Sequence, residues 1–204
     1  MHPVKNAQVG ENRLQIWDEK EQQPDMYGGE MDYQSLFTFI LEMAGTIAFA
    51  ASGAMVGAQR GMDIFGICVL GVVTAVGGGA TRDIILGIVP PGMFQNPIYT
   101  IVATVTSCIV FAIMYWKQEL LEGENRLVYD KIMLVMDSVG LGVFTVMGVD
   151  KGITEGYMGR TFFLVFLGTV TGVGGGLIRD MMAGVPPYIF VRHIYACASI
   201  VGAI

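Results

Sequence analysis

Two arginine–aspartate pairs, Arg82–Asp83 and Arg179–Asp180, stand within apolar stretches, each shortly after a run of three glycines. The glycines are Gly77, Gly78, Gly79, Gly174, Gly175 and Gly176. A charge inside a membrane is costly and usually faces a partner or a water-filled cavity. Adjacent side chains do not share a helical face, so we expect these charges to pair with other segments and to shape the potential at a constriction. The alternative is that they have reached the membrane surface and simply end their segments.

Two acids and several hydroxyl side chains lie in other apolar segments. Glu42 and Asp137 occupy matching places, where a carboxylate would attract a cation and repel an anion. The alternative for both is an acid near the membrane surface, solvated or paired with an arginine. Ser52, Thr74 and Thr171 are candidates to line a polar path, although such hydroxyls also bond to the backbone of their own helix.

The glycines need a compensating role, because each destabilises a helix by about 1 kcal/mol relative to alanine. Glycine permits a kinked or unwound turn whose free carbonyls and amides face an ion or small solute. It also lets neighbouring helices approach closely. Duplication of the motif favours the first role, so we expect both segments to bend or unwind at the glycines and to line a pathway. If the first role is correct, leucine at Gly78 or Gly175 should block flux without preventing assembly. If the glycines serve close helix packing instead, the same substitutions should prevent assembly.

The composition is that of an integral membrane protein. Hydrophobic residues make up 53% of the 204, charged residues make up 15%, and the mean hydropathy is +0.56. A helix that spans the hydrocarbon core needs about 20 apolar residues and satisfies its own backbone. The segments that qualify are 36–58, 64–87, 97–116, 132–149 and 158–184, and a sixth runs from near Phe190 to Ile204. Residues 1–34 are polar and are predicted to form a flexible arm.

An internal repeat organises these segments. Thr74–Asp83 reappears as Thr171–Asp180, and both copies contain the pattern GGGxxRD. Upstream, Glu42, Gly45, Phe49 and Gly53 match Asp137, Gly140, Phe144 and Gly148. Three spans per repeat is an odd number, so the second repeat must enter the membrane from the opposite side. We therefore predict an all-α integral membrane protein of two inverted three-helix units, 35–125 and 126–204, the second cut short in its third helix.

The charge distribution predicts an orientation and excludes several functions. Basic residues near the membrane favour one side, which should be cytoplasmic and which leaves the N-terminus outside. The richer side holds Arg60, Lys117, Arg126, Lys131 and Arg192, and the other holds Lys151 and Arg160. A net charge of −6 opposes nucleic-acid binding. Three cysteines without CxxC spacing and two histidines predict no metal centre, and we expect neither a cofactor nor enzymatic activity.

These residues resemble a known family. The block from Ser52 to Gly66, followed by Thr74–Asp83 with Gly87 and Pro90, resembles the prokaryotic trimeric intracellular cation (TRIC) channels. Some members of that family carry the domain name glycine transporter. Residues 137–187 resemble its second domain, and the whole resemblance covers residues 36–204.

The resemblance implies a homotrimer in the cell membrane with one pore in each protomer. The second and fifth spans of that family are kinked at the glycines and line the pore. The resemblance implies that the protein passes monovalent cations such as potassium. The alternative is that it transports glycine or another small neutral amino acid. The seventh helix of the family is absent from this chain.

Overall fold

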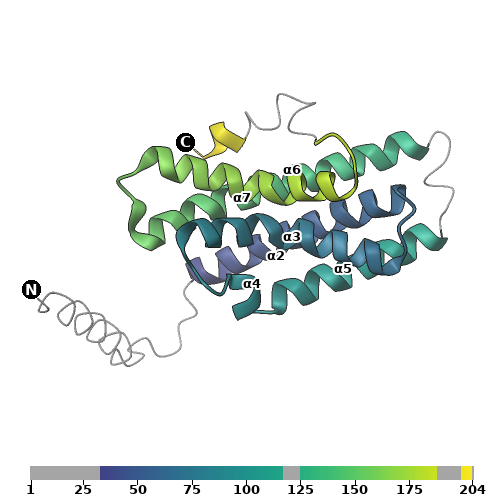
Figure 1. Ribbon diagram of the computed structural model, residues 1–204, viewed down its shortest axis with the longest axis horizontal. Helices are drawn as coiled ribbons and strands as arrows, with labels where there is room; N and C mark the ends of the chain where they lie inside the picture. The colour runs from purple at the N-terminus through teal and green to yellow at the C-terminus, as the bar shows by residue number, and fades with distance from the viewer. Residues whose placement is uncertain (1–32, 117–124, 188–198, 204) are drawn as a thin grey trace, which may run out of the picture. The chain divides into compact units, whose positions relative to one another are not determined.

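The computed structural model describes residues 33–116, 125–187 and 199–203, and five long helices form most of it. They are α2 (Tyr33–Gln59), α3 (Ile64–Leu86), α5 (Ile98–Trp116), α6 (Asn125–Gly152) and α7 (Thr161–Met182) (Figure 1). The short helix α4 (Gly92–Gln95) precedes α5, and a π-helical turn, η2 (Ile153–Tyr157), follows α6. These helices confirm the five predicted segments. The predicted arm and most of the sixth segment lie outside the described residues.

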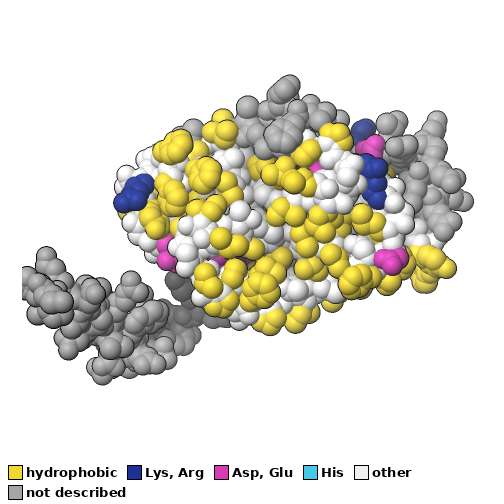
Figure 2. Space-filling model, viewed as in Figure 1, with side chains coloured by type: hydrophobic (Ala, Val, Ile, Leu, Met, Phe, Trp, Pro, Cys, Tyr) yellow, Lys and Arg dark blue, Asp and Glu magenta, His cyan; other side chains and the backbone are white. Residues whose placement is uncertain are grey.

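All five long helices are apolar and long enough to cross a membrane, so the chain is an all-helical membrane protein. Residues 37–204 form one compact unit, distinct from residues 1–36. Within this unit α3 lies between α5 and α7, and α7 packs along α6 (Figure 1). Figure 2 shows hydrophobic side chains across the middle of one face, with basic side chains towards its two ends. That distribution suits an apolar band in lipid with charged groups at the two membrane surfaces.

The two central helices, α3 and α7, end in the same way. Gly87 and Gly184 follow them with φ values of +74° and +65°, a conformation that glycine adopts without a steric penalty. The next amides then turn back, from Ile88 to the Asp83 carbonyl at 2.8 Å and from Val185 to the Asp180 carbonyl at 3.0 Å. Each aspartate of the GGGxxRD motifs therefore lies in the last turns of a capped helix.

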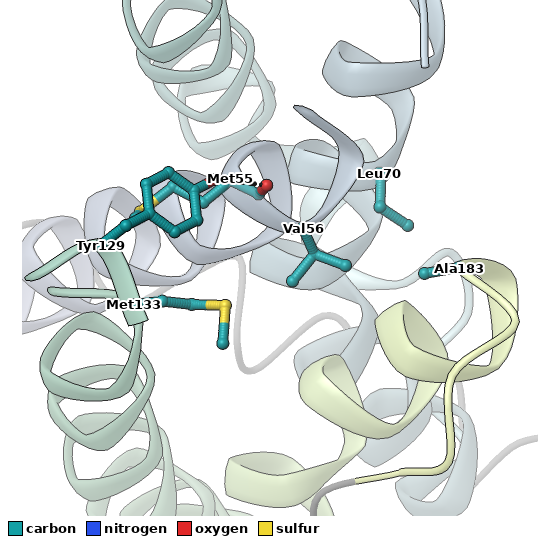
Figure 3. Close-up of a cluster of buried hydrophobic side chains, with 6 residues drawn as sticks. All are labelled: Met55, Val56, Leu70, Tyr129, Met133 and Ala183. Atoms are coloured by element: carbon teal, nitrogen blue, oxygen red, sulfur yellow. Dashed lines mark hydrogen bonds between the residues drawn. The ribbon is translucent and has the colours of Figure 1, made fainter. Parts of the chain in front are cut away.

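A buried hydrophobic cluster packs towards one end of the bundle, which we call the sealed end. The cluster comprises Met55, Val56, Leu70, Tyr129, Met133 and Ala183 (Figure 3). It joins the end of α2, the first half of α3, the start of α6 and the residue after α7. The Tyr129 hydroxyl donates a hydrogen bond to the Met55 carbonyl at 2.5 Å, which leaves no buried polar atom of this ring unpaired (Figure 3).

Candidate functional site

A cavity of about 400 Å³ occupies the opposite end, which we call the cavity end. The start of α2, the end of α3, α4, the start of α5 and the end of α6 surround it. Its charged and phenolic lining consists of Glu42, Arg82, Asp83, Tyr99, Asp150 and Lys151. Gln95, Asn96 and Asp150 are exposed at its rim, so the cavity opens to the surface of the bundle.

Arg82 and Asp83 bond to each other in the cavity wall. The Nε and Nη2 atoms of Arg82 donate to Asp83 Oδ1 at 2.9 and 2.8 Å. Asp83 Oδ2 accepts from the Gly92 amide at 2.8 Å, which ties the end of α3 to α4. We predicted that these charges pair with other segments; Asp83 does so through Gly92, whereas Arg82 bonds to its own neighbour. The long arginine side chain folds back onto the neighbouring carboxylate, although the two residues leave the helix in different directions.

Glu42 faces the same cavity from α2 and accepts a hydrogen bond from the Tyr99 hydroxyl of α5. Its side chain is half-buried. Among the described residues, no lysine, arginine or histidine nitrogen lies within 4.0 Å of its carboxylate. A neutral phenol therefore orients this carboxylate without neutralising it, so a negative charge remains on the cavity wall.

Arg179 lies in a buried cluster that four side chains share. Its Nη1 atom donates to Asp137 Oδ1 and to Ser52 Oγ, both at 2.5 Å, and its Nε atom donates to Asp180 Oδ1 at 2.8 Å. The Arg179 side chain is only 1% exposed, so the bundle encloses it, and its depth in the membrane stays a prediction because it lies in the last turn of α7. Asp180 is another adjacent partner, while Asp137 and Ser52 come from α6 and α2, as expected for pairing with other segments. A buried guanidinium requires such multiple partners.

The two copies of the GGGxxRD motif thus lie in different surroundings. Arg82, with 14% of its side chain exposed, borders the open cavity, whereas Arg179 is enclosed. Glu42 and Asp137 differ in the same sense, since Glu42 lines the cavity and Asp137 is 3% exposed in the cluster. Pairing with an arginine, one of the alternatives for these acids, is therefore found at Asp137, in the interior of the bundle.

The glycine triplets lie within uninterrupted helices, so the prediction that the backbone unwinds there is wrong. Residues 64–86 and 161–182 are α-helical throughout. The physical reason is close approach of α3 and α7. A Cβ atom on Gly78 would lie 2.1 Å from the Thr171 carbonyl oxygen, and one on Gly175 would lie 2.1 Å from the Thr74 carbonyl oxygen. Backbone contact between the helices thus offsets the low helix propensity of glycine.

The other triplet residues have different surroundings. Gly79 lines the cavity, and a Cβ atom on Gly77 would lie 3.0 Å from the Ile178 side chain. A Cβ atom on Gly174 would lie 3.2 Å from the Gly78 Cα atom, and Gly176 is buried in α7. A bend that keeps the helical hydrogen bonds, and a role in lining a pathway, remain predictions.

The predicted hydroxyl lining divides into two kinds of contact. Ser52 belongs to the Arg179 cluster. Thr74 and Thr171 each donate to a carbonyl one turn earlier in their own helix, Leu70 and Leu167, at 2.6 Å. This matches the backbone-bonding alternative for the two threonines, and their place on a path stays a prediction.

Sequence reasoning missed three of the charged and phenolic members of the cavity wall, Tyr99, Asp150 and Lys151. Each lies near the end of a span, where polar residues are common and carry little information. It also treated Phe49 and Phe144 only as markers of the repeat, although their rings contact each other with centroids 5.3 Å apart. The matching positions of these two aromatics in the repeats were the available signal.

The family model described as Glycine transporter matches residues 39–115 and 134–204. The UPF0126 inner membrane protein YadS of Escherichia coli (strain K12) is 39% identical over 170 residues, covering 83% of this chain and 77% of that protein. A UPF0126 membrane protein of Deinococcus radiodurans is 38% identical over 165 residues, covering 80% and 72%.

Solved structures agree with these relatives. The TRIC trimeric intracellular cation channel orthologue from Rhodobacter sphaeroides superposes with a TM-score of 0.72 at 31% identity, covering 82% of this chain and 80% of that one. A prokaryotic TRIC channel determined in 0.5 M KCl gives 0.73 at 31% identity, covering 81% and 80%. The spans, the doubled motif and these matches together lead to one assignment. The chain belongs to the Glycine transporter (UPF0126) family and has the fold of the prokaryotic TRIC channels.

Proposed function

We propose that this protein is a membrane channel that passes monovalent cations such as potassium through a pathway within each protomer. The observation that carries the proposal is the open cavity with an ion-unpaired carboxylate, Glu42, on its wall. Asp150 adds a second carboxylate at the rim, while Arg82 is held by Asp83 and Lys151 by Glu155 at 2.8 Å. Such a vestibule raises the local cation concentration and binds each ion weakly, as conduction requires.

The pathway continues, in this proposal, between two inverted repeats. Reciprocal contacts support the arrangement: Gly78 meets Thr171 while Gly175 meets Thr74, and Gly140 meets Phe49 while Gly45 meets Phe144. In each case the corresponding residues of the two repeats exchange roles, which is the behaviour of contacts around a two-fold axis. In this proposal the buried Arg179 cluster lies on the path beyond the cavity.

The wider setting of the channel follows from its relatives. The solved neighbours are described as trimeric cation channels, and YadS is described as an inner membrane protein. We therefore propose a homotrimer in the cell membrane that acts without enzymatic chemistry. Its cavity end faces outside, because the positive-inside rule puts the Arg60 and Lys131 side in the cytoplasm.

Flux measurements on proteoliposomes test the function. Potassium flux should be present in the parent and should fall several-fold in Glu42→Gln, with reduced preference for potassium over chloride. Asp130→Asn is the matched control, because Asp130 is an exposed acid of the sealed end that contacts Gln59. No potassium flux in the parent or any variant, or equal flux in Glu42→Gln and the parent, would contradict the proposal.

Transport of glycine is the second candidate, and a specific feature favours it. The cavity lining contains both the Glu42 carboxylate and the Arg82 guanidinium, the two kinds of group that the ends of a zwitterion require. Saturable glycine uptake that exchanges with internal glycine would support the transporter. Current under voltage without a solute gradient would support the channel.

A further inference from the structure

We propose that Phe49 of α2 and Phe144 of α6 form a hydrophobic gate that separates the cavity from the buried Arg179 cluster. The inference rests on the proposed pathway and names the residues that close it. The two rings lie with centroids 5.3 Å apart and planes inclined by 30°. Phe144 lines the cavity, whereas Phe49 is only 1% exposed. The pair therefore has one member on the wet side and one in the interior.

The order of residues along α2 puts Phe49 between two polar levels. Glu42 and Thr46 line the cavity, and Ser52 belongs to the Arg179 cluster. Steps of three or four residues keep these side chains on one helical face. At about 1.5 Å of rise per residue, the cavity level at Thr46 and the cluster level at Ser52 are about 9 Å apart along the axis. Phe49 occupies the turn between them.

The same order runs in the opposite direction along α6. Asp137 belongs to the Arg179 cluster, and Phe144 and Met147 line the cavity. Gly140 lies between them, one turn from Asp137, and supports the Phe49 ring: a Cβ atom there would lie 2.1 Å from Phe49 Cδ1. On α2, a Cβ atom on Gly45 would lie 3.2 Å from Phe144 Cε2. Each ring thus seats on a glycine of the opposite helix.

Mainly apolar residues pack around the Phe49 ring, among them the partly buried Val72, Met93 and Tyr99. Phe49 packs with Ala50, Ala75 and Val76, and a Cβ atom on Gly175 would lie 3.4 Å from Phe49 Cδ2. An ion that passed such a layer would lose part of its hydration among apolar side chains, which is unfavourable. Apolar constrictions of this kind stop conduction because water withdraws from them.

The first test measures potassium flux in liposomes that contain the full chain. Phe49→Ala and Phe144→Ala should conduct several-fold faster than the parent, and Phe144→Leu, which retains more apolar volume, should lie between. Phe166→Ala is the matched control, since Phe166 is a surface residue of α7 with 45% exposure, and it should match the parent. Size-exclusion profiles select assembled protein. A parent that conducts as fast as the assembled alanine and leucine variants would overturn the gate.

The second test measures water access independently of conduction. In a background without native cysteines, an impermeant thiol reagent applied from the cavity side should label Thr38→Cys, a partly exposed position of the cavity lining, but not Ser52→Cys. Adding Phe144→Ala or Phe144→Leu should make Ser52→Cys reactive. Ser52→Cys that reacts with both rings in place, or that stays protected without Phe144, would overturn the gate. Absent flux in every protein, together with the expected labelling, would instead contradict the proposed function and retain the barrier.

Discussion

Gly78 of α3 lies so close to Thr171 of α7 that a single added carbon would overlap the threonine carbonyl oxygen at 2.1 Å. A backbone atom cannot rotate away from such an overlap as a side chain does. The contact therefore fixes the separation of the two central helices, and its counterpart between Gly175 and Thr74 fixes it a second time.

Alanine at this crossing should destabilise the bundle. Gly78→Ala and Gly175→Ala are each expected to cost about 1–3 kcal/mol or more, the range for overpacked cores, and to lower the temperature at which the size-exclusion peak is lost. Gly142→Ala is the control, because Gly142 lies on α6 with open space around its Cβ position. It should gain up to about 1 kcal/mol of helix propensity. Equal stability of Gly78→Ala and Gly142→Ala would contradict the close approach.

Removal of one partner from the Arg179 cluster should be costly. Asp137→Asn removes one of the two carboxylates that pair with the Arg179 guanidinium, whose side chain is 1% exposed. Loss of one member of a buried pair costs about 3–5 kcal/mol. Arg82→Gln should cost less, because Arg82 is 14% exposed beside the cavity. Thermal unfolding of the purified variants in one detergent checks this order. A less stable Arg82→Gln protein would contradict it.

Removal of the hydrogen bond at the sealed end should destabilise the protein less than removal of a partner from the Arg179 cluster. Tyr129→Phe removes the donor to the Met55 carbonyl and should cost about 1 kcal/mol of stability, with potassium flux unchanged. The same thermal assay measures the loss, and flux in liposomes measures the function. A marked change in flux would mean that this end takes part in permeation.

Orientation in the cell is open to direct labelling. In a background without native cysteines, an impermeant thiol reagent added to intact cells should label Gly159→Cys, in the exposed turn before α7. Gln118→Cys should stay unlabelled until the cells are opened, because its loop is predicted to be cytoplasmic. The reverse pattern would place the cavity end in the cytoplasm.

Apolar runs were sufficient to predict the helices, since lipid admits few other backbone structures. The consequences of the glycines were not predictable from Gly77–Gly79 alone. Their helical cost is offset by Thr171, a residue 93 positions beyond Gly78 whose proximity is a property of the fold. The contact of Arg82 with Asp83 was not predictable from their positions on the helix either. The arginine side chain is long enough to reach the adjacent carboxylate although the two residues point in different directions. The motif located the charged residues, but the unequal burial of its two copies depended on how α2 and α6 pack around them.

The crossed contacts of Gly78 and Gly175 also constrain how such a protein can change over evolutionary time. Each glycine's tolerance for substitution is set by a residue in the other half, so neither half can drift independently at this crossing.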